Sequence, residues 1–171
     1  MKTDFFKIYG AHERQDGLVV LSEKNSAIYV GFGKDNAEDE SGYNWRKDYD
    51  HIPDVAEIKA DIDALINSHT DAKILTGFSW NGKPVYLSTE NQFNFKAAYD
   101  LAYQTEGANL PAKFKLGEDA EGNPVYHTFT KTEVLADFVM RAFAFINNAL
   151  KEGWTEKDSI DYSLFVPNEN E

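Results

Sequence analysis

The sequence predicts an α+β fold: an N-terminal β element followed by a duplicated ββα unit, a four-stranded antiparallel sheet with helices on one face. Three observations support this prediction. Short β-prone runs crowd the first 32 residues, a helix-periodic segment follows, and two segments 40 residues apart each predict a hairpin leading into a helix. We expect a β-rich N-terminal element with an acidic loop at 1–50, and a helix plus the ββα–ββα domain at 51–171.

Residues 4–32 alternate between β-prone runs and polar connections. The runs span 5–9, 18–21 and 27–32, and a polar five-residue connection typical of hairpins separates the last two. From Gly33 to Asp50 the composition changes to glycine, asparagine, serine and acids, which predicts a solvated loop. A calcium loop is disfavoured, because oxygen-bearing side chains do not fill the required positions and no glycine stands at the turn.

The next segment has the signature of a helix. Pro53 stands at an early helical position with acids in the first turn, which suits the helix N-terminus. Apolar residues then recur on one face at helical spacing, namely Val55, Ile58, Ile62, Leu65 and Ile66. We expect this helix to end between His69 and Asp71, with its acids on a solvated face.

An internal repeat is the most informative pattern of the second half. Gly-x-Pro-Val-Tyr occurs at Gly82–Tyr86 and again at Gly122–Tyr126. Asn-Gly in the first copy supplies the positive φ that a two-residue hairpin turn needs. Proline at the start of each return strand lacks a donor, which suggests a position at a strand end or a sheet edge.

Each copy of the repeat continues into a predicted helix. The first helix has Ser88 or Thr89 as its cap and should stop at Gly107. The second begins at the capping-box spacing of residues 130–133 and should end at Gly153. Because the second helix is apolar over more than one stripe, it is either central to the core or covered by a partner.

Charge and composition narrow the function classes. The chain has 29 Asp and Glu against 17 Lys and Arg, a formal net charge of −12. Nucleic acid and anionic membranes are disfavoured as partners, because both are bound by clustered basic residues. The absence of cysteine excludes disulfides and thiolate chemistry. The N-terminus has no apolar run of signal-peptide length, so we expect a protein made and kept in a cytoplasm.

The sequence offers no clear catalytic constellation. The four histidines lie in different contexts, and no two have the spacing of a metal-ligand pair. Nucleophile elbows and phosphate-binding glycine loops are also missing. Paired carboxylates could cleave a glycosidic bond, but acids are so abundant that coincidental pairs are expected. We therefore predict a non-enzyme with no catalytic residues, no cofactor and no metal.

Aromatic residues are the candidate functional residues, at 14% of the chain. Many should fill the core, whereas tyrosine and tryptophan also suit half-solvated protein interfaces. The candidate interaction residues are Phe5, Phe6, Trp45, Trp80, Tyr86 and Trp154. For Trp80 and Trp154 a place in the core is the alternative.

Three segments resemble a known family. They are Gly77–Leu87, the helix start Glu90–Asn94, and Leu150–Trp154. These residues resemble an uncharacterised domain family of tailed-phage and prophage tail regions, often attached to tail-fibre or fibre-assembly proteins. The stretch from Ile52 onward, about 120 of 171 residues, is similar to proteins of Bacteroidales phages, crAss-like phages included.

The resemblance implies a structural protein of the phage virion, in the tail, fibre or connector region. Such a protein would act through assembly contacts with other virion proteins and with copies of itself, without nucleic acid or membrane. It would lie in the virion, and in the host cytoplasm during assembly. Two alternatives remain: a tail-fibre assembly chaperone that the virion does not retain, and a small glycan-binding module or glycosidase.

Overall fold

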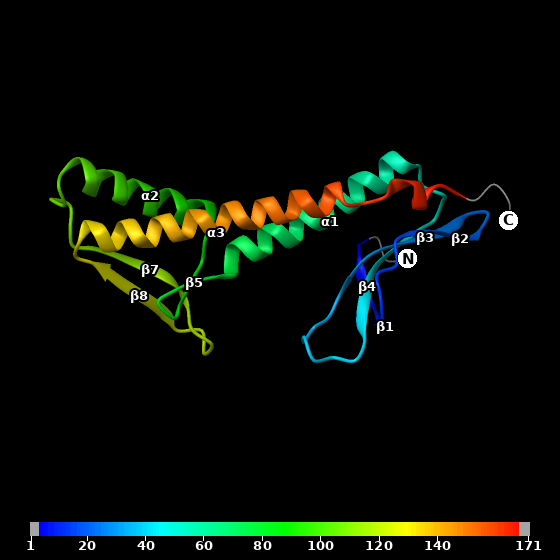
Figure 1. The fold of residues 1–171 in the computed structure, drawn as a ribbon, viewed down its shortest axis with the longest axis horizontal. Helices are drawn as coiled ribbons and strands as arrows, with labels where there is room; N and C mark the ends of the chain where they lie inside the picture. The colour runs from blue at the N-terminus through cyan, green and yellow to red at the C-terminus, as the bar shows by residue number, and fades with distance from the viewer. Residues whose placement is uncertain (1–3, 168–171) are drawn as a thin grey trace. The chain divides into compact units, whose positions relative to one another are not determined.

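The structure is a computed structural model that describes residues 4–167 (Figure 1). It confirms the α+β class, with a four-stranded antiparallel sheet and three α-helices within these residues. The elements in chain order are β1 (Phe6–Ala11), β2 (Gly17–Ser22), β3 (Asn25–Gly33), β4 (Gly42–Tyr49), α1 (Val55–Thr76), β5 (Phe78–Trp80), β6 (Lys83–Val85), α2 (Thr89–Gln104), β7 (Ala112–Glu118), β8 (Pro124–Phe129), α3 (Thr132–Asp158) and the 3₁₀ helix η1 (Tyr162–Phe165).

The described chain divides into two compact units. The sheet unit contains residues 4–66 and 156–167, and the helical unit contains residues 67–155. The division falls inside α1 and near the end of α3, whereas the sequence placed a boundary between residues 50 and 51. Each unit has a hydrophobic core of its own.

The sheet unit contains the four-stranded sheet, in the order β1-β4-β3-β2 with all neighbours antiparallel. The predicted hairpin of β2 and β3 is confirmed, with Leu18 opposite Ile28. The predicted loop from 33 to 50 is wrong in its second half, because residues 42–49 form β4. The charged residues of this segment obscured its β pattern in the sequence. In the structure these charges are paired, with Arg46 Nε 2.7 Å from Asp48 Oδ1.

One face of this sheet packs against α1. The core joins Ile28 and Val30 of β3 to the helix stripe that the sequence predicted, which includes Ile58, Ile62 and Ile66. Two residues from the end of the described chain, Ile160 and Phe165, complete this core. Two buried polar side chains, Ser26 and Asn44, also lie in the sheet. The Asn44 amide donates to the carbonyl of Gly31 at 2.6 Å and to that of Glu13 at 3.2 Å.

The helical unit contains both copies of the repeat. Each copy forms an antiparallel hairpin followed by a helix, but the hairpins form two separate two-stranded sheets. The expected four-stranded sheet is therefore not built from the repeat. One backbone bond, from the N–H of Tyr86 to the carbonyl of Leu116 at 2.7 Å, links the two hairpins. The ladder stops there because Pro84 has no N–H and because Ser88, just beyond, caps α2.

Aromatic rings packed around the buried stripe of α3 fill the core of the helical unit. Phe138 is fully buried, and its ring centroid lies 4.9 Å from that of Phe95, 5.1 Å from that of Phe129 and 5.3 Å from that of Trp80. Such tilted and edge-on pairs are favourable beyond the area that they bury. The sequence allowed two interpretations of this helix, a central place in the core or cover by a partner. The buried stripe of α3 lies in the core.

Two helices are longer than the sequence predicted. α1 continues past Asp71 to Thr76, and α3 continues past Gly153 to Asp158. Gly153 does not end its helix but lies buried within it, where an added Cβ would come 2.5 Å from Thr70 Oγ1. Lys73 and Glu152 form an ion pair beside this contact. Because Gly153 has no side chain, α1 and α3 can pack closely at this point.

Candidate functional site

The six aromatic candidates differ widely in exposure. Phe5, Phe6, Trp45 and Tyr86 are half-buried, Trp80 is 3% exposed, and Trp154 is 60% exposed. Phe5 and Trp45 pack against the core of the sheet unit. Of these residues Trp154 therefore offers a partner the most ring surface. Three of the six belong to the sheet unit and three to the helical unit.

Trp80 belongs to the core of the helical unit. Its indole N–H donates to Asp137 Oδ2 at 3.0 Å, so its one polar atom is satisfied within the chain. The His127 ring packs edge-on against it at 4.9 Å. Burial, and then the positive charge of Lys83, lower the pKa of His127, whose Nδ1 accepts a hydrogen bond from Lys83 Nζ at 3.2 Å. His127 is thus held neutral as part of the packing.

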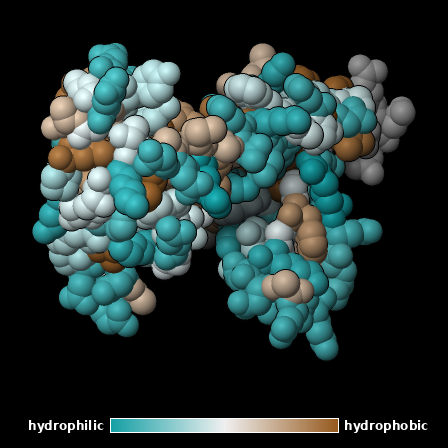
Figure 2. All heavy atoms as spheres, turned by 60° about the vertical axis from the view of Figure 1, so that its left-hand side comes forward, coloured by the Kyte–Doolittle hydropathy of each residue, from teal (hydrophilic) through white to brown (hydrophobic). Residues whose placement is uncertain are grey.

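Two strongly exposed apolar residues of the helical unit lie where α2 runs alongside α3 (Figure 1). Phe93 is 72% exposed and Met140 is 67% exposed. They line two adjoining hollows that share Lys96 and Phe143. We call this the α2–α3 surface, defined by Phe93, Lys96, Tyr99, Met140 and Phe143. In the space-filling view, hydrophobic side chains interrupt the hydrophilic surface of this unit (Figure 2).

The two hollows of the α2–α3 surface have different walls. The larger, of about 560 Å³, is lined by Phe93, Ala97 and Phe143 with polar residues of α2 between Thr89 and Asp100. The smaller, of about 390 Å³, is lined mainly by Tyr99, Val139, Met140 and Phe143. Sequence reasoning missed this surface. A signal existed in the second apolar stripe of α2, because Phe93 and Phe95 cannot both face the core of one straight helix.

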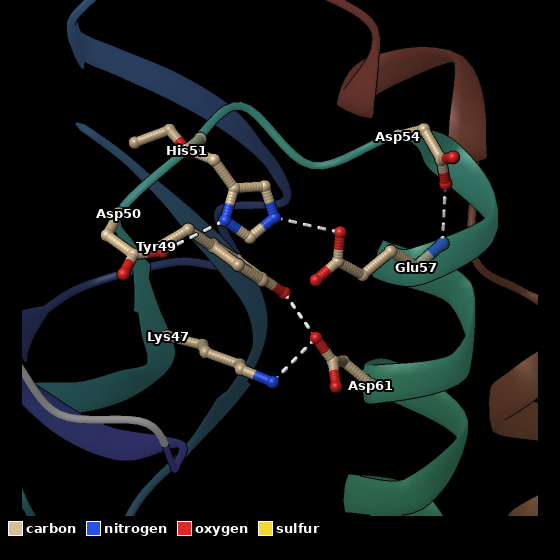
Figure 3. Close-up of polar contacts among 8 residues, drawn as sticks. Lys47, Tyr49, Asp50, His51, Asp54, Glu57 and Asp61 are labelled. Carbon is tan, nitrogen blue, oxygen red and sulfur yellow. Dashed lines mark hydrogen bonds and ion pairs between the residues drawn. The ribbon is translucent and has the colours of Figure 1, made fainter. Parts of the chain in front are cut away.

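A polar cluster joins the end of β4 to the first turns of α1 in the sheet unit (Figure 3). Tyr49 Oη donates to Asp61 Oδ2 at 2.6 Å, and Lys47 Nζ lies 2.6 Å from the same oxygen. Burial, together with the bond to the Asp61 carboxylate, raises the pKa of Tyr49 far above its ordinary value. Tyr49 is therefore a neutral hydrogen-bond donor that fixes α1 to the sheet.

His51 occupies the second half of this cluster. Its Nε2 lies 2.9 Å from Glu57 Oε2 and its Nδ1 lies 3.1 Å from Asp50 Oδ1 (Figure 3). Hydrogen bonding to Glu57, and then to Asp50, raises the pKa of His51, and the same contact lowers the pKa of Asp50. The helix beyond is capped by Asp54, whose Oδ1 accepts from the N–H of Glu57 at 2.8 Å.

The arrangement of the polar cluster suits a structural role, the attachment of α1 to the sheet, better than catalysis. When protonated, His51 donates through both ring nitrogens to carboxylates, so no lone pair points toward a substrate. Tyr49 and Lys47 share one carboxylate. Within residues 4–167, no group of three or more His, Cys, Asp and Glu side chains is placed to hold a metal ion. The cluster thus positions α1 on the sheet.

Two further findings bear on the class of protein. In the part of the chain that the structure describes, no helix has the length and apolar character needed to cross a membrane. Comparison with protein-family models, with curated proteins and with solved structures gave no match.

Proposed function

We propose that the protein is a structural component of a phage virion, in the tail, fibre or connector region, and acts by binding other proteins rather than by catalysis. The α2–α3 surface is the observation that supports the binding role. Its exposed phenylalanine and methionine would lose contact with water in a complex, which drives association. The placement in a virion rests on the resemblance of residues 52–171 to phage tail-region proteins.

The composition of the α2–α3 surface suits a protein partner. Aromatic side chains and methionine are enriched at interfaces, and methionine adapts its shape to the partner. An ion pair between Lys96 and Asp100 at 2.6 Å supplies polar groups beside these apolar side chains. An apolar centre with a polar rim that excludes water is where binding energy concentrates.

The partner that this surface fits is a different protein with a basic contact face. The chain has a net charge of −12, so two acidic copies repel each other as they approach, whereas a basic face is attracted. Binding would place an apolar side chain of that partner in the larger hollow, against Phe93 and Phe143.

The polar cluster supports a non-catalytic role. Its titratable groups bond to one another within hydrogen-bond distance, which stabilises the sheet unit and leaves no activated nucleophile. No observation on the described residues favours the glycan-binding or glycosidase alternative.

Peptide mass spectrometry of purified particles tests the proposal, using the phage or prophage that encodes the chain. We expect the protein in particles at a fixed ratio to the tail proteins. Detection only in the particle-free lysate, bound to a fibre chain, would contradict a virion component and identify an assembly chaperone. Absence from both fractions would overturn assembly altogether.

A variant pair tests the surface itself. We expect Phe93→Ser combined with Met140→Ser to reduce incorporation into particles at least tenfold, because two apolar anchors are lost. The matched control is Val134→Ser, also exposed on α3 but outside both hollows. Equal incorporation of the double variant and the control would show that this surface is not the binding site.

A further inference from the structure

β2 is an exposed edge strand that carries neither a charged side chain nor a proline. It lies at the end of the strand order β1-β4-β3-β2, and no described strand pairs with its outer side. Val19, Val20 and Leu21 are 44%, 45% and 56% exposed. The strand has no proline and no charged side chain, two of the devices by which proteins prevent pairing at an edge. Its one register shift, between Val20 and Ser22, lies at the end of its pairing with β3.

A hollow of about 510 Å³ runs along this edge. Five successive residues, Leu18 to Ser22, line it together with Ile52 and Pro167. Because neighbouring side chains of a strand point to opposite faces, a hollow that touches five in succession follows the backbone rather than one face. It is therefore the place where another strand could align and form main-chain hydrogen bonds.

Further apolar residues lie beside the strand. Helix η1 packs against β2, with the carbonyl of Leu164 3.2 Å from the position of a Cβ on Gly17. Leu164 and Val166 are both more than half exposed, and Ile52 is 41% exposed. An added strand would thus bury apolar side chains in addition to pairing its backbone.

The charge around β2 favours a second copy of the chain as the occupant of this edge. Residues 14–24 contain two basic and two acidic side chains, which cancel, in a chain of net charge −12. Arg14 and Asp16 precede the strand as an ion pair, and Glu23 and Lys24 form the turn after it. The repulsion between two acidic copies is therefore weakest at this locally neutral edge, and an antiparallel β2 from a second copy is equally uncharged and apolar.

We propose that two copies of the chain join through β2. The two β2 strands pair antiparallel about a two-fold axis, so that two four-stranded sheets become one continuous sheet. This pairing uses the sheet unit alone and does not depend on the α2–α3 surface or on the virion role.

A single-cysteine scan tests the pairing, since the chain has no cysteine of its own. Each residue from 18 to 22 is replaced by cysteine in turn, and the full chain is oxidised mildly. Facing Cα atoms of antiparallel strands lie about 4.5–5.5 Å apart, within disulfide range. We expect covalent dimer to peak at one position, near the two-fold axis, and to fall at least fivefold two residues away. The control, Met140→Cys, has similar or greater exposure and should not cross-link.

Light scattering after size exclusion gives the second readout, at about 1–100 µM protein. We expect twice the chain mass of 19.4 kDa for the wild type and for Met140→Lys, and the single mass for Val19→Lys. Circular dichroism checks that each variant is folded. A monomeric wild type throughout, a Val19→Lys variant that is folded and still dimeric, or cross-linking without a positional peak would each overturn the proposal. Incorporation of the Phe93 and Met140 double variant into particles is measured independently. The β2 dimer and the α2–α3 binding surface can therefore each be refuted without the other.

Discussion

Replacing Gly153 with alanine tests how closely α1 and α3 pack in the helical unit. The new Cβ would lie 2.5 Å from Thr70 Oγ1 and 3.6 Å from Thr70 Cβ. Two effects oppose each other. Alanine gains about 0.8–1.0 kcal/mol of helix propensity over glycine, while overpacking a close contact costs about 1–3 kcal/mol. Thr70 is β-branched and has only two favoured χ1 rotamers in a helix, so it has little freedom to relieve the clash. We expect a net destabilisation of about 1 kcal/mol.

Removing the Thr70 hydroxyl should reverse the sign. In a Thr70→Ala background Oγ1 is gone, and the remaining 3.6 Å contact is ordinary van der Waals packing. Gly153→Ala should then stabilise the protein by about 0.5–1 kcal/mol through helix propensity alone. The coupling free energy between the two sites in the double-mutant cycle should be about 1–3 kcal/mol.

Urea unfolding followed by far-ultraviolet circular dichroism measures all four corners of the cycle. For a chain of this size, 1 kcal/mol corresponds to a change in Tm of about 2–4 °C. Asn148→Ala, on an exposed face of α3, is the propensity control and should stabilise by about 0.5 kcal/mol. If Gly153→Ala raised stability equally with and without the Thr70 hydroxyl, the inferred close contact would be wrong.

Three further predictions concern single polar groups. Asn44→Ala should destabilise the protein by about 1–3 kcal/mol in the urea assay, because the buried carbonyl of Gly31 loses its donor; wild-type stability would contradict this. Ser88→Ala should cost about 1 kcal/mol through loss of the cap on α2, while Ser88→Asp should retain it; equal loss in both would argue against capping. The raised pKa of His51 means that the folded state holds its proton more tightly, so its stabilisation is complete below the unfolded pKa of about 6.5 and disappears as pH rises through the folded pKa. The Tm difference between wild type and His51→Gln should therefore shrink as pH rises above 6.5, and parallel profiles from pH 5.5 to 8.5 would refute the pairing with its two acids.

Helical periodicity was the most reliable signal in this sequence. The stripe of Ile58, Ile62 and Ile66 predicted both the helix and the face that it buries, because one spacing determines both. The end of that helix was not predictable. α1 continues to Thr76 because Ile74 is buried in the core of the helical unit, a contact with no local signal.

Strand β4 shows why charged strands escape sequence reasoning. Lys47 is tolerated in a packed sheet because Asp61, on α1, lies 2.6 Å from its ammonium group, and that partner is distant along the chain. The repeat predicted each hairpin correctly, because Asn-Gly and proline determine the local backbone conformation. Whether two hairpins merge into one sheet depends on long-range pairing, which ended at the bond from Tyr86 to Leu116.

The candidate sites were harder to predict than the fold. Trp80 and Phe93 both belong to the first repeat, yet one is 3% exposed and the other is 72% exposed. The difference depends on where the aromatic face of α3 lies, and sequence spacing along α2 does not fix that. The sequence predicted a strand at β2, but it did not predict that this strand lies at the edge of the sheet.

The contribution of Ile160 and Phe165 to the sheet-unit core has a consequence for the order of events during synthesis. Residues 67–155 are an insertion in the sheet unit, so the ribosome makes the whole inserted unit before the residues that complete the core of its host. The strands and the first half of α1 must wait for these residues with Ile28 and Ile58 incompletely covered. In a chain stopped just before Ile160, the helical unit should therefore be packed while the core of the sheet unit is still incomplete. At this stage of synthesis a holding chaperone would find exposed apolar surface.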